Sequence, residues 1–358
     1  MENGGCRLRY SGIDLLRLIL MYMVVLIHIL GHGGILGAVE NGGNNLRYDV
    51  YYLIKVIVTP AVDGYALISG FISSNKEKQN YSKIFVRWSQ VVFYSLGLSL
   101  VLEIFGIVKL NSIKSIIRLS VPIIGGGYWY FACFFALFFM QPYINKMLNS
   151  LCEIEKRRLF LILFMLFSVQ SVITDPYHMN AGFSVAWITV LYILGNLMNR
   201  LKLFEKFKLR HLWILYFMAV IVSWIPIICF RKTVFTSCLS PTIVIQGMVL
   251  VEVFSRISKV PSFITKASPL AFGVYLFHEN SYIRKLIISD KFAFINNYNL
   301  IKGCLALFGY AFLIFVVGLF IDNLRGILFK LIKIEDFSNS FCKYILEKGR
   351  KICNRIVK

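Results

Sequence analysis

Charged residues are scarce in this sequence. They make up 16% of its 358 residues, while apolar residues make up 58%. Soluble globular domains carry about 25% charged residues and a smaller apolar share. The low share of charged residues and the high share of apolar residues exclude an ordinary soluble domain and predict an all-α polytopic membrane protein.

Cysteine patterns that would indicate a disulfide framework or a metal site are also lacking. The eight cysteines form no C-x-x-C pair and have no metal-ligand spacing with the histidines. Several lie within apolar runs, where cysteine usually behaves as a small hydrophobic residue. The sequence therefore predicts neither structural disulfides nor a bound metal.

The net charge of +21 is not gathered in a solvated basic domain. The basic residues form short clusters between apolar runs, which is typical of the flanks of membrane spans. This distribution argues against nucleic acid as a partner. The connecting segments leave no room for an inserted soluble domain.

A straight membrane span needs about 20 predominantly apolar residues. On this rule the sequence predicts ten transmembrane helices, near residues 14–32, 51–72, 88–106, 127–144, 159–174, 183–199, 211–230, 240–256, 269–288 and 302–324. The first run is too long for the apolar region of a signal peptide, and no clear cleavage site follows it. We therefore expect a single membrane-embedded domain over residues 10–325 and a basic, amphipathic cytoplasmic tail over residues 326–358.

The basic residues also predict the orientation of these spans. If the N-terminus is cytoplasmic, the cytoplasmic segments, which include Arg7 and Arg9, contain most of the 39 lysines and arginines. Cytoplasmic segments of membrane proteins carry such an excess. We expect a multi-pass protein of the cytoplasmic membrane with both termini in the cytoplasm. Arg17 and Lys55 fall inside spans.

The first span carries a polar stripe. Arg17 and His28 are eleven residues apart, which brings a helix back to within about 20° of its starting direction and separates them by about 16 Å. Asp14 and His32 lie three and four residues from them, on the same face. Such a stripe predicts a polar cavity, because ionisable side chains facing lipid are costly. The alternative is a structural Asp–Arg pair and a histidine bonded to a carbonyl group.

Two further segments could contribute to a ligand site on the cytoplasmic side. The second span contains Asp63 and ends in small residues that allow close approach of a ligand or another helix: Ser69, Gly70 and Phe71. Lys83 and Arg87 lie at the mouth of the third span and could clamp a phosphorylated or CoA-like ligand. The alternatives are helix packing and ordinary flanking charge.

Other residues could contact a second substrate. His278 and Glu279 lie within the ninth predicted span, where ionisable residues usually mark functional sites. Trp129 and Tyr130 could stack against a sugar, although aromatic residues also gather at membrane interfaces.

Several stretches together resemble the acyltransferase-3 family, whose members are membrane proteins that O-acylate carbohydrates. "GIDLLRLILMYMVVLIHI" resembles its first helix, with arginine and histidine separated by ten residues. "VDGYALISGF" resembles the second-helix motif, and Arg87 falls where the family has a basic residue early in helix three. "GGYWYFACFFALFFMQPYIN" and "SPLAFGVYLFHEN" resemble two later motifs. The matches occur in family order from about residue 10 to 325.

The resemblance implies a function and roles for these residues. It implies transfer of an acyl group, expected to be acetyl from acetyl-CoA, to a hydroxyl of a surface polysaccharide, cell-wall sugar or lipid-linked sugar. His28 would act as base or acyl carrier, and an unperturbed histidine pKa of about 6.5 suits either role. Arg17 would bind the donor or orient the site, with Asp14 fixing it. Ser69, Gly70, Phe71, Lys83 and Arg87 would form the donor entrance.

Asp63, Trp129, Tyr130, His278 and Glu279 are the residues expected at the acceptor. Expected partners are the carbohydrate acceptor, the lipid bilayer and components of polysaccharide biosynthesis. The aromatic motif reads Tyr128-Trp129-Tyr130-Phe131 where W-Y/F-L is commoner, and no esterase-like domain follows the last span.

A transporter or flippase of glycolipid or polysaccharide intermediates is the alternative function. Transporters often show paired spans, broken by glycine or proline, at matching positions in two halves. The sequence shows no such symmetry. It leaves open the acceptor, the acyl group, the side of the membrane on which the acceptor is modified and the oligomeric state.

Overall fold

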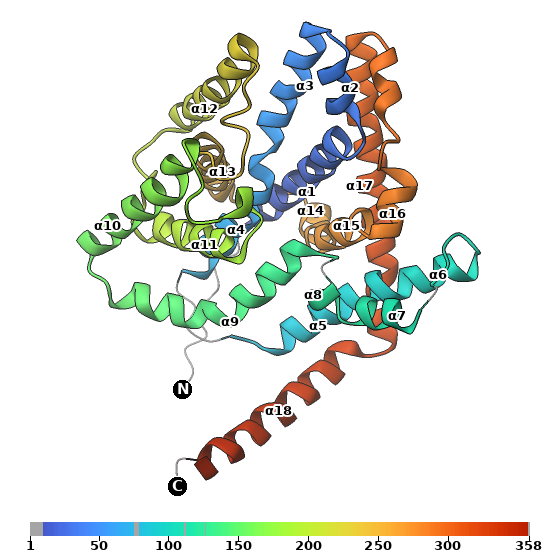
Figure 1. Ribbon diagram of the computed structural model, residues 1–358. Helices are drawn as coiled ribbons and strands as arrows, with labels where there is room; N and C mark the ends of the chain where they lie inside the picture. The colour runs from blue at the N-terminus through green and yellow to red at the C-terminus, as the bar shows by residue number, and fades with distance from the viewer. Residues whose placement is uncertain (1–9, 75–78, 111, 126, 357–358) are drawn as a thin grey trace.

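The structure is a computed structural model that describes residues 10–74, 79–110, 112–125 and 127–356 (Figure 1). Every regular element in these residues is helical. Arg7 and Arg9, which contribute to the predicted orientation, lie outside the described residues, as do Lys76, Lys78 and the last two residues of the predicted tail.

The helices of the N-terminal half are α1 (Ser11–Gly31), α2 (Ile35–Asn41), α3 (Asn45–Val58), α4 (Pro60–Ser73), α5 (Ser82–Val92), α6 (Leu98–Ile104), α7 (Ile113–Ser120), α8 (Pro122–Gly125), α9 (Trp129–Ser150) and α10 (Glu153–Phe164). Those of the C-terminal half are α11 (Val185–Arg200), α12 (Leu209–Phe230), α13 (Pro241–Ser255), α14 (Ser262–Ala267), α15 (Ala271–His278), α16 (Ser281–Ile287), α17 (Leu300–Leu331) and α18 (Ile334–Ile356). Single π turns follow α5 and α10, at Phe93–Gly97 and Met165–Val169.

Six helical segments of the described chain are long and apolar enough to cross a membrane. They are Ser11–Gly31, Asn45–Ser73, Ser82–Ile104, Trp129–Ser150, Leu209–Phe230 and Leu300–Leu331. Each coincides with a predicted span. The chain therefore has the character of a multi-pass membrane protein, but the predicted count of ten is not confirmed.

The other four predicted spans form short or interrupted helices. The segment 159–174 changes from α10 into a π turn and then a 3₁₀ turn. α11 has 16 residues and α13 has 15, fewer than the about 20 that a straight span needs. The segment 269–288 breaks between α15 and α16. An apolar run in the sequence therefore does not by itself give one continuous helix.

α1 lies at the centre of the helical bundle. It packs against α3, α4, α13, α15 and α17, and Leu16, Leu20, Val25 and Ile29 are fully buried. Protein rather than lipid thus surrounds most of this helix. The polar side chains of its stripe can be satisfied by neighbouring helices, which lowers the cost of keeping them in the membrane.

Two glycines allow α4 and α11 to cross in close contact. A Cβ atom on Gly70 would lie 2.0 Å from the carbonyl oxygen of Tyr192, and one on Gly195 would lie 2.2 Å from that of Leu67. Small residues let membrane helices approach at backbone distance. Gly70 therefore has a packing role, whatever else its motif does.

The break between α15 and α16 is made by Asn280. Its Oδ1 accepts from the amides of Tyr282 and Ile283, so it caps α16, and its Nδ2 donates to the carbonyl of Tyr94 at 2.9 Å. Asparagine is a favoured helix-capping residue because its side chain replaces a missing backbone acceptor. The chain turns here, directly after His278 and Glu279.

The C-terminal region is helical. α17 continues past the predicted domain boundary at residue 325 to Leu331, and Lys333, with φ of 54°, turns the chain into α18. α18 projects away from the bundle (Figure 1), and Ser338 near its start donates to the carbonyl of Ser82 at 2.7 Å. Phe337 and Tyr344 on α18 are exposed.

Candidate active site

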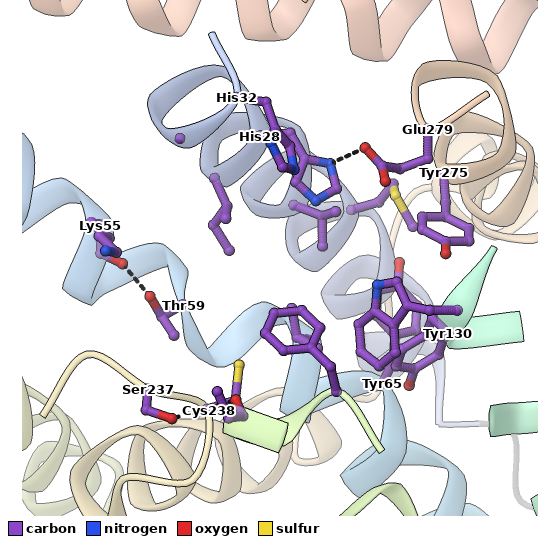
Figure 2. Close-up of a pocket in the computed structure, with 18 of the residues that line it drawn as sticks. His28, His32, Lys55, Thr59, Tyr65, Tyr130, Ser237, Cys238, Tyr275 and Glu279 are labelled. Carbon is purple, nitrogen blue, oxygen red and sulfur yellow. Dashed lines mark hydrogen bonds and ion pairs between the residues drawn. The ribbon is translucent and has the colours of Figure 1, made fainter. Parts of the chain in front are cut away.

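His28 of α1 is bonded to the end of α15. Its Nδ1 lies 2.8 Å from Nε2 of His278. The same Nδ1 lies 3.1 Å from Oε1 of Glu279 (Figure 2). His278 is fully buried and Glu279 is 5% exposed. Residues from the first and the ninth predicted spans thus form one cluster, which we call the His28 cluster: His28, His278 and Glu279.

The hydrogen bonds define which ring nitrogen of His28 carries a proton. Nδ1 of His278 lies 2.6 Å from the carbonyl oxygen of Val274, which can only accept, so this nitrogen is the donor. Nε2 of neutral His278 is then an acceptor, and Nδ1 of His28 must donate to it. Nδ1 of His28 also faces the carboxylate of Glu279, a second acceptor. Neutral His28 therefore has its lone pair on Nε2, the arrangement required of a general base.

Arg284 of α16 holds the carboxylate of Glu279. Its Nη1 lies 3.1 Å from Oε2, while Oε1 faces His28. A carboxylate in this position can stabilise the positive charge that His28 acquires when it accepts a proton. The chain turn at Asn280 brings Arg284 back toward Glu279.

His28 lines a cavity of about 550 Å³, which we call the His28 cavity. Most of its wall is apolar and aromatic, with Trp129, Phe183 and Phe272 contributing. The polar residues that line it include His32, Lys55, Thr59, Thr233, Thr236, Ser237, Glu279 and Arg284 (Figure 2). A mostly apolar cavity with few polar groups is typical of a small-molecule site.

A second cavity, of about 320 Å³, lies around Arg17 and is called the Arg17 cavity. It is lined by polar groups from several helices, including Asp14, Arg17, Ser69, Arg87 and Ser268. Nη1 of Arg17 lies 2.9 Å from Oδ1 of Asp14, which also accepts from the hydroxyl of Ser268 at 3.1 Å. Arg17 and Arg87 give this cavity a positive character.

Three aromatic residues line both cavities: Tyr65, Tyr130 and Phe272. The hydroxyl of Tyr65 donates to the carbonyl of Arg17 at 2.5 Å, and the rings of Tyr65 and Tyr130 lie 6.4 Å apart. The two cavities therefore adjoin at an aromatic partition formed by these three side chains. A ligand occupying both cavities would pass between them.

A buried network of polar side chains holds Arg87 at the wall of the Arg17 cavity. Its Nη1 donates to Gln90 at 2.8 Å, and Gln90 donates to Asp322 at 2.9 Å. Asp322 is fully buried and accepts two bonds from Arg325, at 2.7 and 2.9 Å. Asp322 is thus a paired carboxylate that helps to position Arg87 through Gln90. The guanidinium of Arg87 also lies 5.4 Å from the ring centre of Phe272.

Most of the residues predicted from the sequence meet in these two cavities. Those that line a cavity or belong to the His28 cluster are Asp14, Arg17, His28, Ser69, Arg87, Trp129, Tyr130, His278 and Glu279. His32, the fourth member of the polar stripe, also lines the His28 cavity. The stripe on α1 therefore serves both cavities, with Asp14 and Arg17 at one and His28 and His32 at the other.

Four predicted residues do not line either cavity. Asp63 is fully buried and accepts from the indole Nε1 of Trp187 at 3.3 Å. Gly70 packs against α11, and Phe71 is buried with its ring 5.6 Å from that of Tyr10. Lys83 is exposed on α5. Asp63, Gly70 and Phe71 therefore make structural contacts, and Lys83 is exposed to solvent.

Several cavity residues were not selected from the sequence. Tyr65 and Phe272 are ordinary aromatic residues in apolar runs, and Arg284 was assigned no role because its contact with Glu279 depends on the break at Asn280. Lys55 carried a signal, since a lysine inside a predicted span is unusual. The hydroxyl residues Thr233, Thr236 and Ser237 come from the connection between α12 and α13, which gave no pattern.

The cavity also contains a group of side chains with metal-ligating atoms. His28, His32 and Glu279 each offer one such atom, and the three atoms lie within 4.8 Å of one another. Imidazole and carboxylate groups are suitable ligands for Zn²⁺. A cation bound here would compete with the bond between His28 and Glu279.

These features define a helical membrane protein in which a histidine on a central helix lines a cavity inside the bundle. A family model described as an acyltransferase domain matches residues 10–323, nearly the whole chain. The protein belongs to the acyltransferase-3 family and is a membrane acyltransferase. No curated protein and no solved structure gives a significant match to the chain.

Proposed function

We propose that this protein is a membrane O-acetyltransferase that transfers an acetyl group from cytoplasmic acetyl-CoA to a hydroxyl group of a carbohydrate. The observation that carries this proposal is the bonding of His28. Its Nδ1 donates into the His28 cluster, no hydrogen bond in the described part of the chain reaches its Nε2, and the residue lines a cavity of about 550 Å³. A base with one free nitrogen facing a cavity is what acyl transfer to a hydroxyl requires.

The transfer follows from this geometry. Nε2 of His28 takes the proton of the acceptor hydroxyl while the oxygen attacks the thioester carbonyl carbon. The carbon–sulfur bond then breaks, CoA leaves as a thiolate, and the imidazolium returns the proton to the sulfur. Glu279, held by Arg284, stabilises the imidazolium between these steps. The products are an acetyl ester and CoA with a free thiol.

The Arg17 cavity suits the donor. Arginine recognises phosphate groups well because its planar guanidinium forms paired hydrogen bonds. Arg17 and Arg87 would bind the phosphates of CoA, and the pantetheine arm would pass Tyr65, Tyr130 and Phe272 to bring the thioester to His28. The excess of basic residues predicted on the cytoplasmic side supports entry of the donor from that side.

The experiment is a comparison of wild type with His28→Ala at matched membrane levels. Mass spectrometry of cell-surface glycans would measure acetyl groups added per sugar. Loss of acetylation in His28→Ala alone supports the proposal and identifies the acceptor. Equal acetylation by both strains would show that His28 is structural and that this mechanism is wrong. A mass gain on the protein itself would instead indicate that His28 carries the acetyl group.

A further inference from the structure

Lys55 is a charged residue in the membrane that the proposed chemistry does not use. It lies near the end of α3, within the membrane-spanning segment Asn45–Ser73, and lines the His28 cavity. Its amine lies 5.0 Å from the ring centre of Tyr52. It forms no ion pair with any described residue, although ionisable groups inside membranes are normally paired or functional.

Two other cations of the cavities have carboxylate partners. Arg17 pairs with Asp14 at 2.9 Å, and Arg284 pairs with Glu279 at 3.1 Å. The acid Glu40 accepts a hydrogen bond from the hydroxyl of Tyr52 and forms no ion pair with the amine of Lys55. The charge of Lys55 is therefore available to a group inside the cavity.

Basic residues outnumber acidic residues among the side chains that line the His28 cavity. Among its described lining residues Glu279 is the one acid, and Arg284 already neutralises it. Apart from Arg284, the one lysine or arginine among these described lining residues is Lys55. Thr59 and Ser237 lie on the side of the cavity with Lys55, whereas His28 and His32 lie across from them (Figure 2); Thr233 and Thr236 also line the cavity.

We propose that the acceptor carries a negative charge, a phosphate or a carboxylate, and that Lys55 binds this charge while an acceptor hydroxyl reaches His28. The proposal rests on the function proposed above and specifies its acceptor class. A lysine amine in a poorly hydrated cavity attracts an anion strongly, because the surroundings screen the charge less than water does. An acceptor fixed at two opposite walls would also be oriented for attack on the thioester.

The test uses the full-length protein purified in detergent and three sugars that differ in charge. Glucose 1-phosphate carries a phosphate, glucuronate carries a carboxylate, and methyl glucoside is neutral. Isothermal titration calorimetry would measure their dissociation constants. We expect at least one of the two anions to bind about tenfold or more tightly than methyl glucoside, as a charge-assisted hydrogen bond should give. The two anions distinguish phosphate recognition from carboxylate recognition.

Substitutions test whether the preference for an anionic sugar arises in the His28 cavity. Lys55→Gln should lower the affinity for the preferred anion to that for methyl glucoside, while Lys55→Arg should retain the preference. Lys232→Gln removes the same charge from an exposed residue of the connection between α12 and α13 and should change nothing.

Three results would overturn the proposal: equal affinity of wild type for all three sugars, binding of none of them, or an anion preference that persists in Lys55→Gln. If Lys55→Gln does not fold, the affinities of wild type for the three sugars still test the proposal. Release of CoA from acetyl-CoA by wild type and His28→Ala is measured in parallel. CoA release that depends on His28 without anion preference would leave the acetyltransferase standing and reject the anionic acceptor. Anion binding through Lys55 without CoA release would reject the acetyltransferase.

Discussion

Nδ1 of His28 lies 2.8 Å from Nε2 of His278, a residue 250 positions later in the chain. This contact joins the central helix α1 to the broken helical segment that contains α15 and α16. It also determines the proton on His28, because the other nitrogen of His278 is bonded to a carbonyl group. In the proposed mechanism, the role of His28 as a base therefore depends on the conformation of a distant segment.

Glu279→Gln should slow acetyl transfer without preventing donor binding. Glutamine keeps the size of the side chain but removes the charge that stabilises protonated His28. We expect kcat to fall by about ten- to a hundredfold, part of the contribution that acid–base groups usually make. Steady-state kinetics would measure this, with the KM for acetyl-CoA expected to change little. An unchanged kcat would show that Glu279 does not act on His28.

Arg87→Gln should weaken the binding of acetyl-CoA. The guanidinium lines the Arg17 cavity, and loss of a charge-assisted bond to phosphate should raise the KM by about tenfold or more. Lys83→Gln, on the same helix but exposed, is the matched control and should leave the KM unchanged. Equal effects of both substitutions would indicate only a general attraction of CoA to basic residues.

Phe272→Trp should obstruct the partition between the cavities. The larger ring would narrow the passage for the pantetheine arm and reduce acetyl transfer. Binding of 3′,5′-ADP, which lacks that arm, should be retained because it needs only the Arg17 cavity. Calorimetry and turnover measurements on one preparation would separate the two effects. Full turnover in Phe272→Trp would mean that the donor does not pass this residue.

Gly70→Ala should destabilise the fold. The added Cβ would lie 2.0 Å from a backbone oxygen of α11, so the two helices must separate, at a cost of at least about 1–3 kcal/mol. Gly309→Ala is the control, because no heavy atom lies within 4 Å of its Cβ position. Fluorescence-detected size-exclusion chromatography of heated samples would measure the melting temperature of each variant. Equal melting temperatures would contradict the close crossing of α4 and α11.

Added Zn²⁺ should inhibit the enzyme, and metal removal should not. The ligating atoms of His28, His32 and Glu279 lie within 4.8 Å, so zinc can occupy the atoms that acid–base chemistry needs. We expect EDTA to leave activity unchanged and to reverse zinc inhibition. His32→Ala should reduce the sensitivity to zinc more than it reduces activity. Loss of activity in EDTA would instead show that the metal takes part in the reaction.

The sequence predicted much of the site because its strongest signals are local. Helical periodicity placed Asp14, Arg17, His28 and His32 on one face, and all four line cavities. His278 and Glu279 were predicted as site residues because they are ionisable and lie within the ninth apolar run. These inferences need only the pitch of a helix and the cost of charge in a membrane.

Other features depend on contacts that no local pattern contains. The role of Arg284 follows from the turn that Asn280 makes, and Asp63 is removed from the cavities by its bond to Trp187. The predicted count of ten spans is not confirmed for a similar reason. Hydropathy cannot distinguish one long helix from α15 and α16, which a single capping side chain separates.

The break after α15 also bears on the competition between transfer and hydrolysis. Two carbonyl groups near this helix end accept hydrogen bonds from side chains: Val274 from His278, and Leu276 from the hydroxyl of Tyr128 at 2.9 Å. These two carbonyl groups therefore need no ordered water beside the His28 cluster. In the proposed reaction, water held there would be a rival nucleophile for the thioester, so carbonyl groups bonded by protein side chains favour delivery of the acetyl group to the intended acceptor.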